Sequence, residues 1–172
     1  MIKKVKIQKS EKINIYIDGA NLDKGIKDLG WNLDYKRFYR WLKDKYKFKN
    51  IYLFIGLVPR FKDLYKYLQE IGYVLVFKET TSDGDGNVKG NCDADLVLAV
   101  SRDFYEDKFD KSIIVSSDGD YASMIKFLKD KKAIKILLSP NNKCSILLKR
   151  TGVPISYLNY QKRKIQQNRK NP

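Results

Sequence analysis

Two aspartates two residues apart are the best candidates for chemistry in this 172-residue chain. Asp118 and Asp120 come directly after Ile113–Ser117, an apolar run that ends in two serines, and a helical pattern begins at Tyr121. In an open α/β sheet, ligands bind outside the carboxyl ends of the strands. We therefore expect both carboxylates to lie at an edge of a sheet where a ligand can bind.

Two further aspartates occupy comparable positions in the chain. Asp18 follows Ile13–Ile17, which has the β-branched composition of a strand, and Asp93 opens a helical pattern. A helix that feeds a parallel strand runs antiparallel to it, so its first residue lies at the carboxyl edge of the sheet. We therefore expect Asp18 and Asp93 to meet Asp118 and Asp120 at one edge.

The chemistry of such a cluster follows from its charge and from the residues that the chain lacks. Carboxylates held close together repel one another strongly at low dielectric, so the cluster needs a cation. The sequence contains no histidine, which excludes Ser-His-Asp and Cys-His nucleophiles and histidine-ligated zinc. Ligands that are all oxygen favour Mg²⁺ or Mn²⁺, which orient a phosphate and activate water. The residues predict a metal-dependent phosphoryl-transfer site with the ligands Asp18, Asp93, Asp118 and Asp120.

The elements that must position these residues are strands alternating with helices. Apolar runs predict strands over 13–17, 51–56, 73–77, 113–117 and 133–138, with a short final strand over 153–157. Helical spacing favours helices over 22–29, 33–47, 59–71, 93–104, 121–131 and 143–150. Continuously apolar strands indicate a sheet covered on both faces, which makes a three-layer α/β sandwich with a mostly parallel sheet.

The charge of the chain favours a polyanionic partner. The formal net charge is +15, and residues 159–172 carry five basic residues and no acidic one. Nucleic acid or an acidic membrane surface fits this balance, although a lysine-rich soluble surface would also produce it. The candidates for contacts to an RNA backbone are Lys89, Lys143, Lys149 and Arg150.

Composition also bounds the organisation of the chain. We expect a basic lead-in over 1–12, one domain over 13–158 and a basic tail over 159–172. The sequence contains no run of about 18 apolar residues, so we expect no membrane span. The N-terminus lacks the apolar segment of a signal peptide. The expected compartment is therefore the cytoplasm, and the sequence leaves open whether the chain forms a homodimer.

Two other patterns in the sequence could suggest a metal site, but neither predicts one. The run Asp83–Asn87 resembles part of a calcium loop, but Val88 lies where the loop needs a glycine and Ala94 where it needs a glutamate. We expect a polar loop over 78–92 instead. Cys92 and Cys144 are far apart and form no CxxC motif, so we expect buried or half-buried thiols.

Three segments together resemble a known family. Ile15–Leu22 (IYIDGANL), Lys89–Leu96 (KGNCDADL) and Val115–Tyr121 (VSSDGDY) look like the three signature motifs of NYN domains, which are PIN-like, LabA-type ribonucleases. The resemblance implies a Rossmann-like PIN fold with the sheet order 3-2-1-4-5. It also implies cleavage of RNA that depends on Mg²⁺ or Mn²⁺.

The resemblance also implies roles for individual residues. By position, Asp18, Asp93, Asp118 and Asp120 match the acidic set of the family. The side chains expected to support these carboxylates are those of Asn21, Asp95, Ser116 and Ser117. Ser117 departs from the family, which usually has glycine there, and serine adopts a positive φ only at a cost.

Two other functions fit the same sequence. A non-catalytic RNA-binding or regulatory module would keep the fold and the basic ends without cutting RNA, and a self-associating scaffold would need neither metal nor RNA. The sequence does not separate RNA from DNA as the partner.

Overall fold

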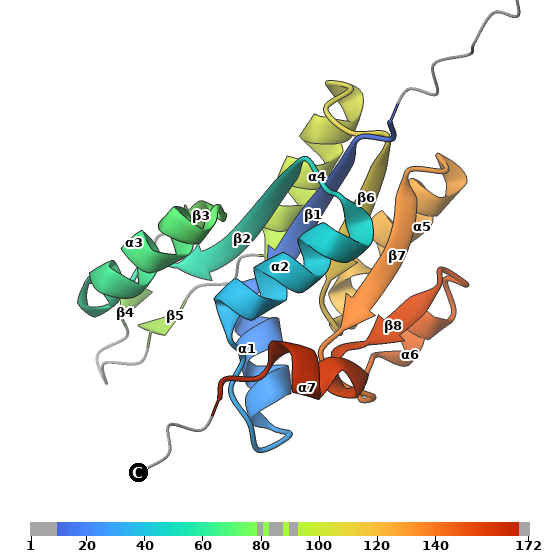
Figure 1. Cartoon of the computed structure of the whole chain (residues 1–172). Helices are drawn as coiled ribbons and strands as arrows, with labels where there is room; N and C mark the ends of the chain where they lie inside the picture. Colours follow the sequence, from blue (N-terminus) through green and yellow to red (C-terminus); the bar gives the residue numbers. More distant parts are fainter. Residues whose placement is uncertain (1–9, 79–80, 83–87, 90–92, 169–172) are drawn as a thin grey trace, which may run out of the picture.

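A parallel sheet forms the centre of the molecule (Figure 1). The structure, a computed structural model, describes residues 10–78, 81–82, 88–89 and 93–168. Within them the sheet has the order β3-β2-β1-β6-β7-β8, and every pair of neighbouring strands is parallel. Its strands are β1 (Ile13–Asp18), β2 (Asn50–Gly56), β3 (Val74–Lys78), β6 (Lys111–Val115), β7 (Ile134–Ser139) and β8 (Ile155–Tyr157). The predicted fold class and order are confirmed, and β8 extends the sheet as a sixth strand.

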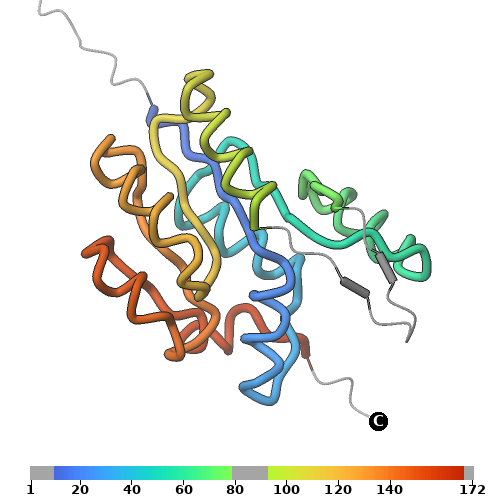
Figure 2. Tube along the Cα trace, turned by 180° about the vertical axis from the view of Figure 1, so that it is seen from behind, coloured from blue at the N-terminus to red at the C-terminus, as the bar shows by residue number. Residues whose placement is uncertain are grey.

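Helices cover both faces of this sheet. Buried side chains of α1, α2, α3 and α7 pack on one face, and those of α4, α5 and α6 pack on the other, which Figure 2 shows from behind. The helices are α1 (Gly19–Lys27), α2 (Tyr35–Tyr46), α3 (Lys62–Ile71), α4 (Asp93–Tyr105), α5 (Ala122–Asp130), α6 (Ile146–Lys149) and α7 (Lys162–Ile165). This is the predicted three-layer sandwich.

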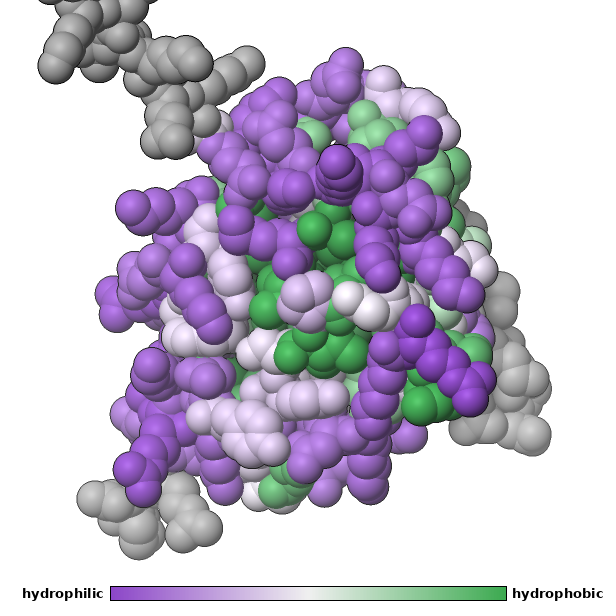
Figure 3. Space-filling model, turned by 90° about the vertical axis from the view of Figure 1, so that its right-hand side faces the viewer, coloured by the Kyte–Doolittle hydropathy of each residue, from purple (hydrophilic) through white to green (hydrophobic). Residues whose placement is uncertain are grey.

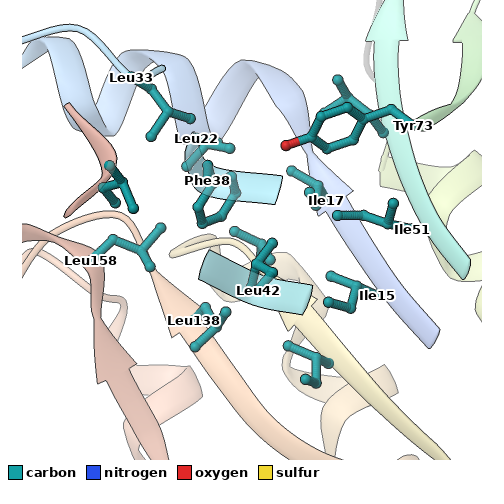
Figure 4. Packing of buried hydrophobic residues seen from close by; sticks show 14 of the residues in the cluster. Ile15, Ile17, Leu22, Leu33, Phe38, Leu42, Ile51, Tyr73, Leu138 and Leu158 are labelled. Atoms are coloured by element: carbon teal, nitrogen blue, oxygen red, sulfur yellow. The ribbon is translucent and has the colours of Figure 1, made fainter. Parts of the chain in front are cut away.

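The alternation of side chains along β1 decides which face Asp18 belongs to. Ile15 and Ile17 pack against Phe38 of α2 in one core cluster (Figure 4), whereas Tyr16 belongs to the cluster on the opposite face. Because successive side chains of a strand point to opposite faces, Asp18 shares the face of Tyr16. That is the face on which α4 and α5 begin.

A short 3₁₀ turn precedes two of the helices. A 3₁₀ turn, η2 (Gly119–Tyr121), precedes α5 because the Asp118 carboxylate accepts a hydrogen bond from the Asp120 N–H at 3.0 Å. A second 3₁₀ turn, η1 (Pro59–Phe61), precedes α3 without a side-chain cap and with proline in its first turn. The sequence predicted α-helix from Pro59 and from Tyr121, so η1 and the last residue of η2 replace the first turns of the predicted helices.

Residues 158–168, here called the C-terminal segment, fold back on the domain. The segment comprises the 3₁₀ turn η3 (Leu158–Gln161), α7 and the three residues after it. Ile165 is fully buried, and the Arg37 guanidinium donates hydrogen bonds to the carbonyl oxygens of Arg163, Lys164 and Gln166. Much of the predicted basic tail is therefore packed against α2.

The predicted polar loop over 78–92 contains a short hairpin. Strand β4 (Thr81–Ser82) pairs antiparallel with β5 (Val88–Lys89). Cys92, the calcium-like run over 83–87 and the first nine residues of the predicted lead-in lie outside the described residues, as do residues 169–172. Cys144 is buried, as expected.

The face on which β8 and α6 lie is largely hydrophilic. Figure 3 views the molecule from this side and shows hydrophilic residues around a central group of hydrophobic ones. Within the described residues, none of the helices has the length and apolar character needed to cross a membrane.

Candidate metal centre

Three carboxylates converge at the carboxyl edge of the sheet. Asp93, Asp118 and Asp120 each offer an oxygen atom, and these three atoms lie within 4.8 Å of one another. Asp93 is the first residue of α4, and the other two belong to the turn between β6 and α5. The three residues are called the acidic cluster below. The expectation that these three meet at one edge agrees with the geometry.

Two serines at the end of β6 shape the turn that carries Asp118. Ser116 is fully buried, and its hydroxyl oxygen accepts a hydrogen bond from the Asp118 N–H at 3.1 Å. The Asp118 carboxylate in turn caps η2 through the Asp120 N–H. Asp118 is partly buried, and Asp120 is the exposed member of the cluster.

Asp18 lies beside the acidic cluster in a more buried position. Its carboxylate caps α1 by accepting from the Asn21 N–H at 3.0 Å, and the Ser116 hydroxyl donates to it at 3.4 Å. Burial raises the pKa of Asp18, a hydrogen bond from the Asn21 N–H opposes the rise, and the charges of Asp93 and Asp118 add to it. Asp18 is not one of the three carboxylates within 4.8 Å.

Tyr121 joins Asp18 to the acidic cluster. Its ring is fully buried, and its hydroxyl lies 3.2 Å from the Asp18 carboxylate and 2.5 Å from that of Asp93. Burial raises the pKa of Tyr121, and the charge of Asp18 adds to this. Tyr121 is not among the residues that the sequence predicts for the site. The only signal in the sequence is that a buried tyrosine hydroxyl needs a partner, and this does not identify Asp18 or Asp93.

Asn21 fixes the turn from the neighbouring strand. Its side-chain oxygen accepts hydrogen bonds from the N–H and the hydroxyl of Ser117, at 2.8 and 2.9 Å. Ser117 is not among the described residues with a positive φ. Serine therefore replaces the family's usual glycine here without backbone strain, and its hydroxyl gains a bond that glycine cannot make.

Asp95 and the predicted basic residues lie outside the acidic cluster. Asp95 faces β3, where the Lys78 ammonium lies 3.9 Å from its carboxylate. Lys143 is exposed in the loop after β7. Lys149 and Arg150 end α6 beside Thr151, whose carbonyl accepts from Lys129 in the last turn of α5. Helix α5 begins at the cluster and runs away from it, so this pair lies at its far end. Lys89 is in β5, and its side chain is outside the described part of the chain.

The donor set fits a hard divalent cation. All the donor atoms are carboxylate oxygens, which Mg²⁺ and Mn²⁺ prefer. Among the described side chains, no lysine or arginine forms an ion pair with Asp18, Asp118 or Asp120. The single hydrogen of the Tyr121 hydroxyl can serve only one of its two carboxylate neighbours at a time. Within the described residues, the negative charges of Asp18, Asp118 and Asp120 are therefore not balanced by ion pairs.

Gly19, the first residue of α1, packs closely against β2 next to Asp18, and this packing yields a testable prediction. A methyl group on Gly19 would lie 2.8 Å from the Phe54 carbonyl oxygen and 2.5 Å from Ile55. Because backbone must shift to admit it, Gly19→Ala is expected to lower the free energy of unfolding by about 1–3 kcal/mol. Urea unfolding measures this, with Ala20→Ser at the adjacent exposed position as the control. Unchanged stability of Gly19→Ala would contradict the packing described.

Comparisons with known proteins agree with this fold. A model of the NYN domain family matches residues 12–156, which confirms the resemblance seen in the three motifs. The crystal structure of a protein of unknown function from Vibrio parahaemolyticus matches with a TM-score of 0.77 and 18% identity, over 95% of this chain and 100% of that one. That likeness shows a shared fold.

Other matches add little. The complex of leucoanthocyanidin reductase with NADPH from Vitis vinifera has a TM-score of 0.43 and 15% identity, over 84% of this chain and 48% of that one, and it is too distant to bear on this chain. No curated protein matches the chain.

Proposed function

The chain belongs to the NYN domain family, and from that premise we propose that it is a ribonuclease that hydrolyses RNA phosphodiester bonds with Mg²⁺ or Mn²⁺. The observation that carries the proposal is the acidic cluster, in which three carboxylates offer oxygen atoms within 4.8 Å of one another. A cluster of this kind at the carboxyl edge of a parallel sheet lies where ligands of such sheets bind. The excess of basic residues in the chain supports a polyanionic substrate.

Each residue of the site has a distinct part in this proposal. Asp93, Asp118 and Asp120 would hold the metal, with Asp18 next to them. When bound, the ion would supply Lewis-acid stabilisation of the phosphate and a lowered pKa for the attacking water. Tyr121 orients Asp18 and Asp93 by its hydrogen bonds, and Asn21 and Ser116 hold the two turns from which the carboxylates project.

A cleavage assay tests the proposal. The full chain is incubated with labelled single-stranded RNA in Mn²⁺ or Mg²⁺, and in parallel with a chelator. We expect shortened products only where the metal is present. RNA that is bound but stays intact under all conditions would overturn the ribonuclease assignment and favour the non-catalytic RNA-binding module.

The tyrosine bridge gives a separate prediction. Tyr121→Phe removes the hydroxyl that contacts both Asp18 and Asp93 while keeping the buried ring. Substitution of a residue that orients a metal ligand lowers metal affinity or activity about 10–100-fold. We therefore expect the variant to need correspondingly more Mn²⁺ for half-maximal cleavage.

A matched control lies in the same core cluster. Tyr16→Phe also removes a buried hydroxyl, but that hydroxyl donates to Asp103, in the last turns of α4 and away from the cluster. The Mn²⁺ dependence of Tyr16→Phe should equal that of the wild type. An equal shift in both variants would mean that Tyr121 acts only through stability.

A further inference from the structure

Four cavities adjoin one another around the C-terminal segment. The first, of about 210 Å³, is lined by Lys143 and Asn159, and the second, of about 370 Å³, shares Asn159 with it. The third, of about 620 Å³, shares Lys162 and Arg163 with the second. The fourth, of about 780 Å³, shares Lys162 with the third and reaches Tyr67 of α3. These shared lining residues link the four cavities, which are together called the C-terminal groove below.

The charge of this groove is mainly positive. Lys143, Lys162, Arg163 and Lys164 line it with exposed side chains. Two acidic residues also line it, Asp28 and Asp34. The Asp34 carboxylate is engaged in capping α2, where it accepts from the Arg37 N–H at 3.0 Å. The net excess of cations suits a chain of phosphates.

The groove also offers rings and amide groups. The Tyr160 side chain is 71% exposed and that of Tyr67 is 42% exposed. Carboxamides line every one of the four cavities, from the side chains of Asn32, Asn141, Asn142, Asn159, Gln161, Gln166, Gln167 and Asn168. The side chain of Asn159 has an oxygen atom that is buried without a hydrogen-bond partner within the described residues. Exposed aromatic rings stack unpaired bases and carboxamides bond their edges, a combination typical of sites for single strands.

The loop after β7 connects this groove to the acidic cluster. The Ser145 N–H donates to the Ser117 carbonyl oxygen at 3.1 Å, next to Asp118. At its other end the Asn141 amide donates to the Gly25 carbonyl oxygen at 2.7 Å, near the end of α1 where the first cavity opens. Lys143 lies between the two contacts. The groove therefore begins one loop away from the candidate metal centre, at the same edge of the sheet.

We infer that the C-terminal groove binds the stretch of a single-stranded RNA that extends away from the acidic cluster. The inference rests on the proposed function for its choice of RNA, but it assigns binding to residues that take no part in the chemistry. Linked cavities with spaced cations and exposed rings fit a flexible chain with splayed bases. A regular duplex would not present its bases to these rings.

Binding measured without metal tests this inference apart from catalysis. The full chain is titrated in chelator with fluorescent single-stranded RNAs of about 4–16 nucleotides, the range that single-strand-binding grooves cover. The salt dependence of the affinity is compared for the wild type and for K162Q/R163Q. Loss of two phosphate contacts should reduce the slope of log K against log [salt] by about 1.4. Because Arg37 bonds the backbone carbonyls of α7, the substitutions leave its anchoring contacts in place.

Matched variants at the opposite edge of the sheet provide the controls. K49Q/K131Q also removes two exposed lysines, one just before β2 and one just after α5, and should leave the slope unchanged. Tyr160→Ala should weaken binding by at least about fivefold through lost stacking. Tyr105→Ala, which removes an equally exposed ring at the end of α4, should not.

The outcomes separate this inference from the proposed ribonuclease activity. Equal effects of the groove variants and the control variants would overturn the groove even if the chain cuts RNA. Failure of the wild type to bind RNA in chelator would overturn it too. Salt-dependent binding that is lost selectively in K162Q/R163Q and Tyr160→Ala would support the groove even if the chain proved unable to cut.

Discussion

Asp118→Asn is expected to lower the rate of Mn²⁺-dependent RNA cleavage by at least about a hundredfold. Asp118 contributes one of the three converging oxygen donors, and a metal's stabilisation of the charge that develops on a phosphate is worth several kcal/mol. The turn should survive, because asparagine caps a helix about as well as aspartate. Initial rates on a labelled single strand, at saturating RNA, measure the effect.

The control for this variant is an aspartate far from the cluster. Asp130→Asn removes the same charge at the exposed end of α5, and its rate should stay within about twofold of the wild type. Binding of RNA to Asp118→Asn in chelator should be undiminished, since the substitution removes a negative charge. Equal cleavage by Asp118→Asn and the wild type would contradict the catalytic assignment.

Mn²⁺ is expected to raise the thermal stability of the wild-type chain and to leave Asp118→Asn almost unaffected. A ligand that binds only the folded state at a hundred times its dissociation constant stabilises by about 2.7 kcal/mol. For a chain of this size that corresponds to a rise of about 5–10 °C in Tm. In chelator, where no metal is bound, the Tm of Asp118→Asn should equal or exceed that of the wild type. The reason is that the variant carries one fewer of the crowded carboxylates around Asp18.

Differential scanning calorimetry with increasing MnCl₂ measures this stabilisation. Asp130→Asn again serves as the control and should gain as much as the wild type. A gain of equal size in Asp118→Asn would place the bound ion elsewhere on the molecule, and the absence of any gain in the wild type would count against a metal at this site.

The sheet was predictable because its strands are continuously apolar. β1 and β6 are short β-branched runs buried on both faces, and each ends in aspartate-bearing turns. That pattern is typical of a parallel strand in the middle of a sheet. The meeting of Asp93 with Asp118 then follows from the direction in which α4 must run. The ends of helices were less predictable. The 3₁₀ turn η2, for example, depends on a single cap, the Asp118 carboxylate.

The contacts that complete the site were not predictable, because they join residues far apart in the sequence. Nothing in the local pattern indicates that the Tyr121 hydroxyl reaches Asp18, or that Asn21 holds Ser117. The same reason applies to the C-terminal segment. Its composition is basic and polar, and the contacts that tie it to the domain come from residues far away in the sequence, such as the guanidinium of Arg37 and the backbone of Asn32 and Asp34.

A crystal structure of the wild-type chain soaked in MnCl₂ tests the central claim most directly. The account predicts an anomalous difference peak for Mn²⁺ at coordination distance, about 2.1 Å, from oxygens of Asp93, Asp118 and Asp120. The same soak of Asp118→Asn should lose that peak or weaken it strongly. A wild-type crystal with no peak among these carboxylates, or with a lysine ammonium bound there instead, would contradict the account.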